Sequence, residues 1–381
     1  MDTSQLALLS QDMNLEPDAT HEVACHPVVN GKPFDIPISE LQMPGGKTLK
    51  VLKTLLTSAC ERNCYYCPFR AGRDMRRTTL KPEQMADTFM ELQRAKLVDG
   101  LFLSSGITGG GIRTQDKLLD TVDILRNKRG YRGYIHLKIM PGAEYDQVAR
   151  AMQLATRLSV NLEAPNSQRL ALLAPKKEFT EELVRPLQWV EQIRREQSPH
   201  KTWNGRWPST VTQFVVGAVG ESDLELISTS EYLYKQAHIQ RAYYSAFRPL
   251  RDTPFENLPA EDPLRQHRLY QSSFLLRDYG FGLEDMPFDQ SGNLPRDIDP
   301  KLMWATQNLA EAPIEINLAP RERLLRIPGI GPRSADVILK NRRLSKIASL
   351  RDLEKLGVQT KRAVPFILLD GKQPARQMVM F

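Results

Sequence analysis

The sequence lacks several features that would place it in other classes of protein. No uninterrupted apolar run approaches about 18 residues, so no membrane-spanning helix is predicted. The first residues lack the positive region of a secretory signal peptide, and the default expectation is a cytoplasmic, reducing compartment. Only 4 of the 381 residues are cysteine. In such a compartment, clustered cysteines indicate metal ligands or catalytic groups and not disulfides.

Excess charge is absent from most of the chain. The sequence has 52 Lys and Arg and 45 Asp and Glu, a net charge of +7. Residues 311–381 contain 14 basic and 7 acidic residues, which leaves 38 of each sign in residues 1–310. A neutral body with a basic C-terminal segment favours binding of a polyanion by that segment. A solvated surface without a partner would have the same composition, so charge alone leaves both interpretations open.

The length exceeds what one hydrophobic core usually supports, so several domains are predicted. Residues 1–46 are weakly patterned and are interpreted as an N-terminal extension. Residues 47–255 alternate short apolar runs with helical patterns and form the predicted catalytic body. Residues 256–310 are interpreted as a helical connector, and residues 311–381 as a basic C-terminal domain.

Six predicted strands alternate with helices across the body. The strands are expected at 51–56, 101–105, 134–139, 158–163, 210–219 and 241–247, and the helices at 82–97, 116–128, 145–157, 181–196, 223–236 and 263–279. This alternation predicts parallel βα units with right-handed crossovers. We therefore predict an α/β fold, a partial (β/α)6 barrel with its site at the C-terminal strand ends, followed by a small all-α domain. A flat doubly wound sheet is the alternative, but no glycine-rich dinucleotide fingerprint follows the first strand.

Three of the four cysteines lie within eight positions, directly after the first predicted strand. Cys60, Cys64 and Cys67 have the spacing C-x3-C-x2-C. Three close thiolates can hold three irons of a cubane iron–sulfur cluster and leave the fourth iron open for chemistry. A zinc site would need a fourth ligand, which Cys25 or His26 could supply. A redox disulfide between Cys64 and Cys67 is the third alternative.

Basic residues near the cysteines would offset the negative charge of thiolates and a cluster. They are Arg62, Arg70, Arg73, Arg76 and Arg77. Polar residues on the interior faces of two strands also need partners, which favours a ligand near Lys138, Asn161 and Glu163. His136 lies on the same strand face as Lys138 and is interpreted as a core histidine with satisfied hydrogen bonds.

The cysteine motif, with Tyr66 immediately before the last cysteine, resembles the signature of the radical S-adenosylmethionine (SAM) superfamily. The resemblance covers roughly residues 47–255. It implies a 4Fe-4S cluster held by Cys60, Cys64 and Cys67, with SAM as the second cofactor and Glu163 among the catalytic residues. The segment 103–106 departs from the usual Gly-Gly-Glu wording of the family. The expected cofactor contacts are Tyr66, Ser104, Ser105, Gly106, Lys138, Asn161, Glu163, Gly217, Val219 and Glu221.

A second motif lies in the basic segment. A short helix is predicted to end near Arg326, and a loop with two glycines leads to a helix that begins at Pro332. Backbone N–H groups at such a loop suit a phosphate. The motif resembles a helix-hairpin-helix, and residues 353–358 with Lys361 and Arg362 resemble a degenerate second copy. The expected nucleic-acid contacts are Pro328, Gly329, Ile330, Gly331, Arg333, Ser334, Lys340, Arg342 and Arg343. A helical module for protein contacts is the alternative.

The body and the basic segment together resemble a bacterial family of radical SAM proteins linked to DNA modification or repair. The segments 101–106, 134–138 and 243–249 are similar to that family's wording. The resemblance implies a helix-hairpin-helix that binds nucleic acid, with DNA preferred. It also implies a reductant such as flavodoxin or ferredoxin, and association with a uracil-DNA-glycosylase-like partner.

The resemblance further implies reductive cleavage of SAM to methionine and a 5′-deoxyadenosyl radical. That radical would abstract hydrogen from a nucleotide that is single-stranded or flipped out of its duplex. Two alternatives remain. The same chemistry could act on RNA, a small molecule or a peptide, with the C-terminal domain as a docking module. The chain could instead be a non-catalytic nucleic-acid-binding protein with a structural or redox-sensing cluster.

Overall fold

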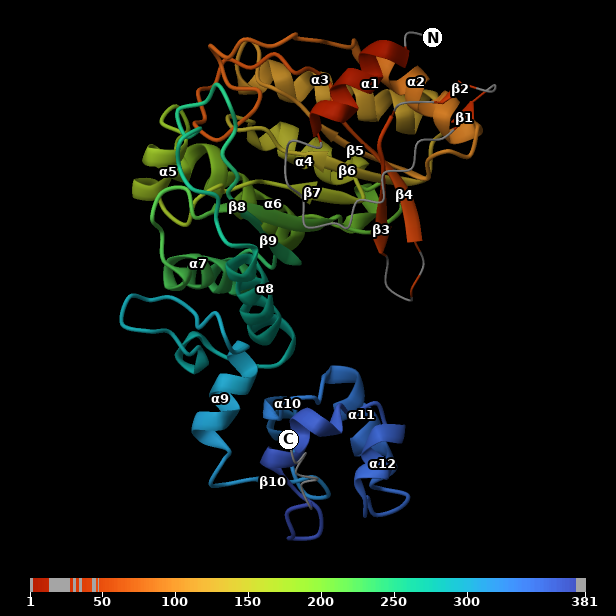
Figure 1. The fold of residues 1–381 in the computed structure, drawn as a ribbon. Helices are drawn as coiled ribbons and strands as arrows, with labels where there is room; N and C mark the ends of the chain where they lie inside the picture. The colour runs from red at the N-terminus through yellow and green to blue at the C-terminus, as the bar shows by residue number, and fades with distance from the viewer. Residues whose placement is uncertain are drawn as a thin grey trace. The chain divides into compact units, whose positions relative to one another are not determined.

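The computed structural model describes residues 3–13, 28–29, 32–33, 36–42, 46 and 48–374 (Figure 1). Cys25 and His26 lie outside the described residues. The chain divides into two compact units, Met1–Glu221 with Tyr232–Asp262, and Ser222–Glu231 with Pro263–Phe381. Residues 256–262 belong to the first unit and residues 263–310 to the second, and the predicted domain boundaries stay predictions.

A seven-stranded sheet organises the described part of the first unit, in the order β3-β4-β5-β6-β7-β8-β9. The six strands predicted from the sequence are present and pair in parallel. The strand β3 was not predicted, and it pairs antiparallel with β4. The bounds are β3 Ile38–Gln42, β4 Thr48–Leu55, β5 Gly100–Ser104, β6 Tyr134–Lys138, β7 Arg157–Ser159, β8 Ser209–Val216 and β9 Arg241–Ala246.

The helices that follow these strands are α2 Pro82–Arg94, α3 Gly111–Asp123, α4 Tyr145–Leu154, α5 Ser167–Leu173, α6 Arg185–Glu196 and α7 Asp223–Gln236. Among them, α2 and α4 end three residues earlier than predicted, α6 begins four residues later, α3 begins five residues earlier, α5 was not predicted, and α7 matches the prediction. The N-terminal segment, predicted only as an extension, contains the helix α1 Thr3–Met13 and the short strands β1 Val28–Val29 and β2 Lys32–Pro33. Leu6, Leu9 and Met13 of α1 are buried, and α1 packs beside β4.

The two faces of the sheet differ in chemistry. Leu101, Leu103 and Leu137 alternate along β5 and β6 and are fully buried, as expected for the face that helices cover. The alternate positions Phe102 and His136 are only partly buried and point to the opposite face. The sheet is a curled α/β half-barrel with an apolar outer face and a more polar interior.

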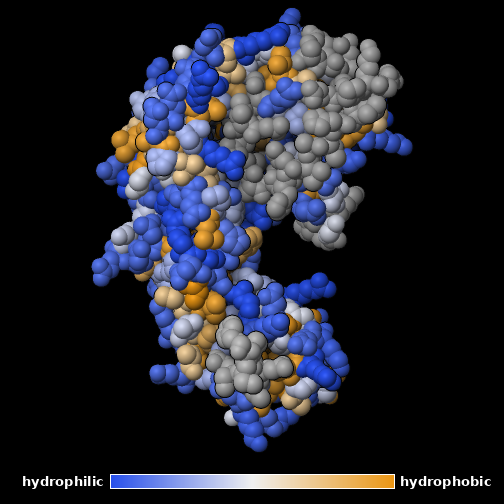
Figure 2. Space-filling model, viewed as in Figure 1, coloured by the Kyte–Doolittle hydropathy of each residue, from blue (hydrophilic) through white to orange (hydrophobic). Residues whose placement is uncertain are grey.

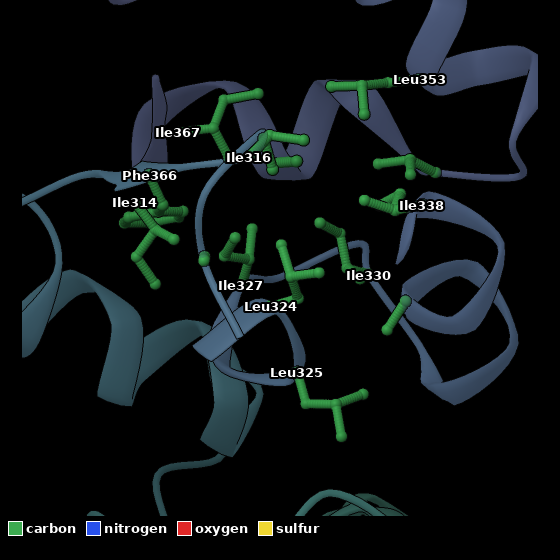
Figure 3. Packing of buried hydrophobic residues seen from close by; sticks show 14 of the residues in the cluster. Ile314, Ile316, Leu324, Leu325, Ile327, Ile330, Ile338, Leu353, Phe366 and Ile367 are labelled. Carbon is green, nitrogen blue, oxygen red and sulfur yellow. The ribbon is translucent and has the colours of Figure 1, made fainter. Parts of the chain in front are cut away.

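From Pro263 onward, the second unit contains the 16-residue helix α8, several shorter helices and two short strands. Its elements are α8 Pro263–Asp278, α9 Pro300–Asn308, β10 Ile314–Glu315, α10 Arg321–Arg326, α11 Pro332–Asn341, α12 Leu350–Lys355, α13 Thr360–Ala363 and β11 Ile367–Leu368. Figure 3 shows Ile327, Ile330 and Ile338 within one cluster of buried side chains. The strands β10 and β11 pair in parallel within the same unit.

Two similar loops lie against each other in the second unit. The first hairpin loop, residues 327–331, joins α10 to α11, and the second, residues 356–359, joins α12 to α13. Gly329 and Gly357 hold corresponding places with φ of 85° and 80°, a region that favours glycine. The N–H of Gln359 donates to the Gly329 carbonyl at 3.0 Å, and Ser334 Oγ donates to the Gly357 carbonyl at 2.8 Å. The two loops therefore support each other directly.

The described residues on the face drawn in Figure 2 are mostly hydrophilic, with small apolar patches between them. Within the described ranges, none of the helices combines the length and the apolar character needed to cross a bilayer.

Candidate active site

The three cysteines lie on a long loop, residues 56–81, which we call the cysteine loop. It leaves the C-terminal end of β4 and returns to α2. The N–H of Leu56 donates to the Ser104 carbonyl at 2.8 Å, and the N–H of Leu80 donates to the Leu56 carbonyl at 2.9 Å. The N–H of Ser58 donates to the Thr78 carbonyl, also at 2.9 Å. These bonds close both ends of the loop against the sheet.

Arg77 holds the middle of the cysteine loop. Its guanidinium donates to four backbone carbonyls of the loop, those of Ser58 at 2.7 Å, Phe69 at 2.8 Å, Arg70 at 2.9 Å and Arg73 at 3.3 Å. The carbonyls of an irregular loop lack the partners that a helix or a sheet would give them. The guanidinium of one arginine has five N–H donors and can bind several of these carbonyls at once. Arg77 was predicted to offset cluster charge, and the structure gives it this positioning contact.

Two other arginines near the cysteines also bind carbonyl oxygens. Arg73 donates to the Pro68 carbonyl at 3.0 Å and to the Arg251 carbonyl at 3.2 Å. Arg62 donates to the Lys176 carbonyl and pairs with Glu182. The cysteine loop is thus tied to the loops that follow β7 and β9.

The three cysteine side chains line one cavity at the C-terminal ends of the strands. Cys64 is buried, and Cys60 and Cys67 are partly buried. Two sulfurs accept backbone hydrogen bonds, Cys60 from the N–H of Ile107 and Cys67 from the N–H of Phe69, both at 3.4 Å. N–H groups aimed at sulfur suit thiolate ligands of a cluster, whose potential such bonds adjust.

The alternatives for the cysteines fare differently. All three are free thiols, so the structure contains no Cys64–Cys67 disulfide. Among the described residues, no three His, Cys, Asp or Glu side chains surround a point where a single metal ion could be held. A cubane cluster does not need such a point, because its thiolates bind separate irons. The zinc alternative calls for Cys25 or His26, which lie outside the described residues, so it stays a prediction.

The loop after β5 lies very close to the cysteine loop. A Cβ added to Gly106 would lie 2.1 Å from the Ala59 carbonyl oxygen and 3.2 Å from Cys60 Cβ, so only glycine fits. Glu61 accepts the N–H groups of Gly109 and Gly110, each at 3.0 Å. Ser105 and Gly106 line the cysteine cavity. Ser104 does not line it; its Oγ is buried without a hydrogen-bond partner among the described residues.

The strand that carries Asn161 and Glu163 is shorter than predicted. β7 ends at Ser159, and both residues lie beyond it, so the predicted strand 158–163 was too long. Glu163 has φ of 65°, a conformation that costs free energy in any residue with a side chain. Its backbone still bonds to β8, donating to the Gln213 carbonyl at 2.9 Å and accepting from Val215 at 2.8 Å. Asn161, Glu163 and Lys138 all line the cysteine cavity.

Glu163 forms a buried ion pair with Lys177, a residue that the sequence analysis missed. Lys177 Nζ lies 3.0 Å from Glu163 Oε1, and the two side chains are 9% and 5% exposed. Tyr66 makes a further side-chain hydrogen bond to Glu163. Burial opposes the charged form, but Lys177, Lys138 and the bond from Tyr66 outweigh it and hold the pKa of Glu163 below its usual range.

Lys177 also lies near the cysteines. Burial opposes its charge, but Cys64 and Glu163 raise its pKa above the ordinary lysine value. Burial raises the pKa of the Cys64 thiol, and the charge of Lys177 opposes that rise. Lys177 follows α5 in the run Pro175-Lys176-Lys177, which has no spacing that marks a site. The sequence alone therefore did not identify Lys177, and the structure shows that it lines the cysteine cavity.

The glycine-rich segment after β8 forms a turn closed by its own glutamate. Glu221 is buried, and its carboxylate accepts the N–H groups of Gly217 and Val219. Gly217 has φ of 93°. None of the three lines the cysteine cavity. The structure therefore gives Glu221 a turn-forming contact, and the predicted cofactor contacts of this segment remain predictions.

Residues 54–227 match the family model of the radical SAM superfamily. No curated protein matches the chain. Similar solved structures include the FeFe-hydrogenase maturase HydG from Carboxydothermus hydrogenoformans, with 17% identity over 60% of this chain and 51% of that chain and a TM-score of 0.46. Methylornithine synthase (PylB) is 15% identical over 60% of this chain and 61% of that one, with a TM-score of 0.47. This chain spans about half the length of HydG.

The family model covers the segment from β4 to α7 that carries the cysteine loop and the cavity. The match supports the radical SAM superfamily for this segment. The cofactors of the class are a 4Fe-4S cluster and SAM, and such enzymes require a reductant. The match thus supports the predicted class and cofactors for this segment, and the catalytic and non-catalytic alternatives stay predictions.

Proposed function

We propose that this enzyme applies radical SAM chemistry to a nucleotide of a nucleic acid, with DNA preferred, and that its second unit binds the nucleic-acid backbone. The proposal rests on the two hairpin loops, which are joined by the hydrogen bond from Gln359 to Gly329. Both loops lie in the segment 311–381, which contains the whole excess of positive charge of the chain. The first unit would supply the chemistry, and the second would hold the substrate.

Cys60, Cys64 and Cys67 would hold the cluster, and Ser105, Gly106, Asn161 and Glu163 line the cavity in which SAM would bind. When bound, the cluster and SAM supply a carbon radical able to remove an unactivated hydrogen. The chain's own residues orient and enclose that chemistry. Arg77 fixes the loop backbone, and the buried pair of Glu163 and Lys177 places opposite charges at fixed positions on the cavity wall.

The hairpin loops support a helix-hairpin-helix interpretation of the second unit. The loop 327–331 has the glycines at 329 and 331, and α11 begins directly afterwards at Pro332. The first turn of a helix leaves N–H groups without intrahelical partners, and these favour phosphate. Ile330 and Val358 are buried at matching places in the two loops, so both loops have the same apolar anchor.

The predicted nucleic-acid residues divide into two groups by exposure. Arg333, Lys340 and Arg343 are exposed and available to a phosphate. Pro328 and Ile330 are buried and would act through the shape of the loop. Arg342 donates to the carbonyls of Ile316 at 3.1 Å and Ala319 at 2.6 Å, so its first task is to position that segment.

The binding test uses the full chain, reconstituted with its cluster under anaerobic conditions. Fluorescence anisotropy would be measured with duplex DNA, single-stranded DNA and RNA of one sequence, over a range of salt concentrations. We expect affinity to fall as salt rises, because bound cations release counterions. The variant R333Q/K340Q/R343Q should weaken binding to every sequence and reduce the slope of log K against log salt by about one for each phosphate that is no longer neutralised.

The matched control is K117Q/K128Q/R132Q, which removes three exposed cations from the first unit and should leave the slope unchanged. Equal effects of the two triple variants would contradict the assignment of the second unit. Turnover is followed by the release of 5′-deoxyadenosine and by mass spectrometry of the digested nucleic acid. A small molecule or a peptide, but no nucleic acid, that is modified with stoichiometric 5′-deoxyadenosine would favour the alternative substrates.

The identity of the reductant, flavodoxin or ferredoxin, and of a uracil-DNA-glycosylase-like partner stays part of the proposal. Both follow from the resemblance of the whole chain to the DNA-modification family. Pull-down of each purified candidate with the reconstituted chain tests them, and a reductant is assigned only if it also supports 5′-deoxyadenosine formation.

A further inference from the structure

The three cysteine sulfurs differ in the groups that stabilise negative charge on them. Cys60 Sγ accepts the N–H of Ile107, and Cys67 Sγ accepts the N–H of Phe69, each at 3.4 Å. Among the described residues, no other residue donates an N–H to Cys64 Sγ. Cys64 is also the most buried of the three, at 6% exposed. Burial disfavours a thiolate, so Cys64 needs another source of stabilisation.

Two contacts hold the backbone near Lys177 against the cysteine motif. The N–H of Tyr65, the residue after Cys64, donates to the Leu173 carbonyl at 2.9 Å. Arg62, two residues before Cys64, donates to the carbonyl of the residue that precedes Lys177. Residues on either side of Cys64 are therefore bonded to the segment that ends at Lys177. The side chains of Cys64 and Lys177 both line the cysteine cavity.

The ion pair with Glu163 fixes the ammonium of Lys177 but does not cancel its effect on Cys64. Lys177 Nζ lies 3.0 Å from Glu163 Oε1, and the two side chains are 9% and 5% exposed. Little water is therefore available to screen either charge. Lys177 lowers the pKa of the Cys64 thiol more than Glu163 raises it. The pair as a whole therefore stabilises negative charge at the Cys64 sulfur.

A fixed positive charge beside a cluster ligand has a direct consequence for electron transfer. Reduction of an iron–sulfur cluster adds one electron, and therefore one negative charge, while its thiolate ligands stay the same. A positive charge near those ligands stabilises the reduced state more than the oxidised state. Net charge, hydrogen bonds to the sulfurs and solvent exposure together set the reduction potential of such clusters, and a buried charge acts more strongly than one at the surface.

We propose that Lys177 raises the reduction potential of the 4Fe-4S cluster by placing a buried positive charge beside its Cys64 ligand. Lys177 acts through Cys64 and is not itself a catalytic residue. It serves at Cys64 the purpose that the N–H groups of Ile107 and Phe69 serve at the other two cysteines. The electron itself comes from the reductant. The inference rests on the cluster of the proposed radical SAM function, and not on nucleic acid as the substrate.

The test is a redox titration of the full chain, reconstituted with its cluster and free of SAM, followed by electron paramagnetic resonance of the reduced cluster. At the midpoint potential of the parent chain, Lys177→Met should lower the ratio of reduced to oxidised cluster about tenfold, a shift of about 59 mV for one electron. Lys177→Arg keeps the positive charge and should restore the parent midpoint. The matched control Lys176→Met alters the exposed neighbour and should leave the midpoint unchanged.

Two further variants separate the charge of Lys177 from its contribution to stability. Lys177→Met/Glu163→Gln leaves no buried charge uncompensated, so its stability should approach that of the parent. Its midpoint should still lie below that of the parent, because the net positive effect on Cys64 is gone. Glu163→Gln alone keeps Lys177 and removes the opposing charge, so it should raise the midpoint. A purely structural role of Lys177 would make the midpoint follow stability across these variants.

Iron per chain and the absorbance of the cluster are measured for every variant, so that loss of the cluster is distinguished from a change in its potential. The proposal is overturned if the double variant has the parent midpoint, if Glu163→Gln lowers the midpoint, or if Lys176→Met and Lys177→Met have equal effects. A parent chain that assembles no 4Fe-4S cluster would contradict the radical SAM function as well. A normal cluster with an unchanged midpoint in the variants would contradict the role of Lys177 alone.

Discussion

Each unit buries a lysine beside one of its loops, and the pKa values of the two lysines are shifted in opposite directions. Lys177, beside the cysteine loop, pairs with Glu163 at 3.0 Å, and its pKa is raised. Lys301, beneath the first hairpin loop, donates to the Ile330 carbonyl at 2.6 Å and lies 4.5 Å from the Tyr279 ring centroid. Burial, reinforced by Arg362 and opposed by Asp299, lowers its pKa to about 7. Burial disfavours the charged form of both lysines. At Lys177 the neighbouring Cys64 and Glu163 outweigh burial and raise the pKa.

The loops beside these lysines are also held differently. The cysteine loop is long, and the side chain of Arg77 supplies donors to its carbonyls. The hairpin loops are short and are held by glycine geometry, buried Ile330 and Val358, and one backbone bond between them. The first arrangement depends on one charged residue, and the second depends on glycines and two buried apolar side chains.

The largest expected effect is from removing Lys177. Lys177→Met leaves Glu163 buried without its partner, which should lower the free energy of unfolding by about 3–5 kcal/mol. The double variant Lys177→Met/Glu163→Gln should recover most of that loss, because no charge is then left uncompensated. Urea denaturation of the first unit measures the effect. Lys176→Met changes an exposed neighbour and should be nearly neutral; an equal loss there would contradict the ion-pair explanation.

Removing Arg77 should have the next largest effect. Arg77→Met leaves four loop carbonyls without their donor, and we expect a loss on the order of 3 kcal/mol, since bonds from a charged donor are the stronger class. Iron bound per chain after reconstitution should fall with it. The control Arg76→Met alters the exposed neighbour. If both variants bind iron like the parent, Arg77 does not determine the loop conformation.

The hairpin loops can be tested with two glycines that share a backbone conformation. A Cβ at Gly329 would lie 2.4 Å from the Gln359 carbonyl oxygen, whereas nothing lies within 4 Å of a Cβ at Gly371. Both have positive φ, 85° and 72°, so the conformational cost cancels between Gly329→Ala and Gly371→Ala. Gly329→Ala should destabilise the second unit by roughly 1–3 kcal/mol more, measured by hydrogen exchange in α11 and α13. Equal effects would mean that the loops are not in close contact.

The smallest expected effect, taken per pH unit, is a dependence of stability on pH. The pKa of Lys301 is about 7 when folded, against 10.5 for an ordinary lysine. Below pH 7 both states carry the proton, and the cost of burying the charge is complete. Between pH 7 and 10 the unfolded chain binds more protons, so stability of the second unit should rise with pH by at most about 1.4 kcal/mol per unit.

Lys301→Met should abolish this rise, and Lys340→Met, at an exposed position, should retain it. Stability is read from urea midpoints of the second unit at pH 7, 8, 9 and 10. A flat profile in the parent chain would show that the buried amine keeps its proton, and the contrast with Lys177 would disappear.

Much of the first unit was predictable because strand and helix periods alternate clearly between residues 48 and 246. The cysteine spacing favoured a cluster because its three ligands lie close together in sequence, and SAM was implied by the resemblance to the superfamily. The end of β7 was not predictable, because Asn161 and Glu163 alternate like strand residues while Glu163 adopts a left-handed backbone. The strand β3 was missed because its extended conformation goes with its pairing to β4, which the sequence does not indicate.

Interactions between distant segments account for the rest. Lys177 and Glu163 are separated by a short helix, and no spacing rule connects them. The loops 327–331 and 356–359 were each visible as glycine-containing turns, but the bond from Gln359 to Gly329 depends on how four helices pack. Lys53, His136 and Arg157 lie in one row across the sheet, and only the register between the strands shows this. The hydrophobic periodicity of a segment predicts the secondary structure of that segment, but not the segment against which it packs.

The contacts made by Arg77 also bear on the order of events during maturation. One side chain of the polypeptide donates to four carbonyls of the cysteine loop, and none of these contacts involves iron. We therefore expect the loop to fold before iron and sulfide are added, unlike the metal-dependent domains that are unfolded until their ion binds.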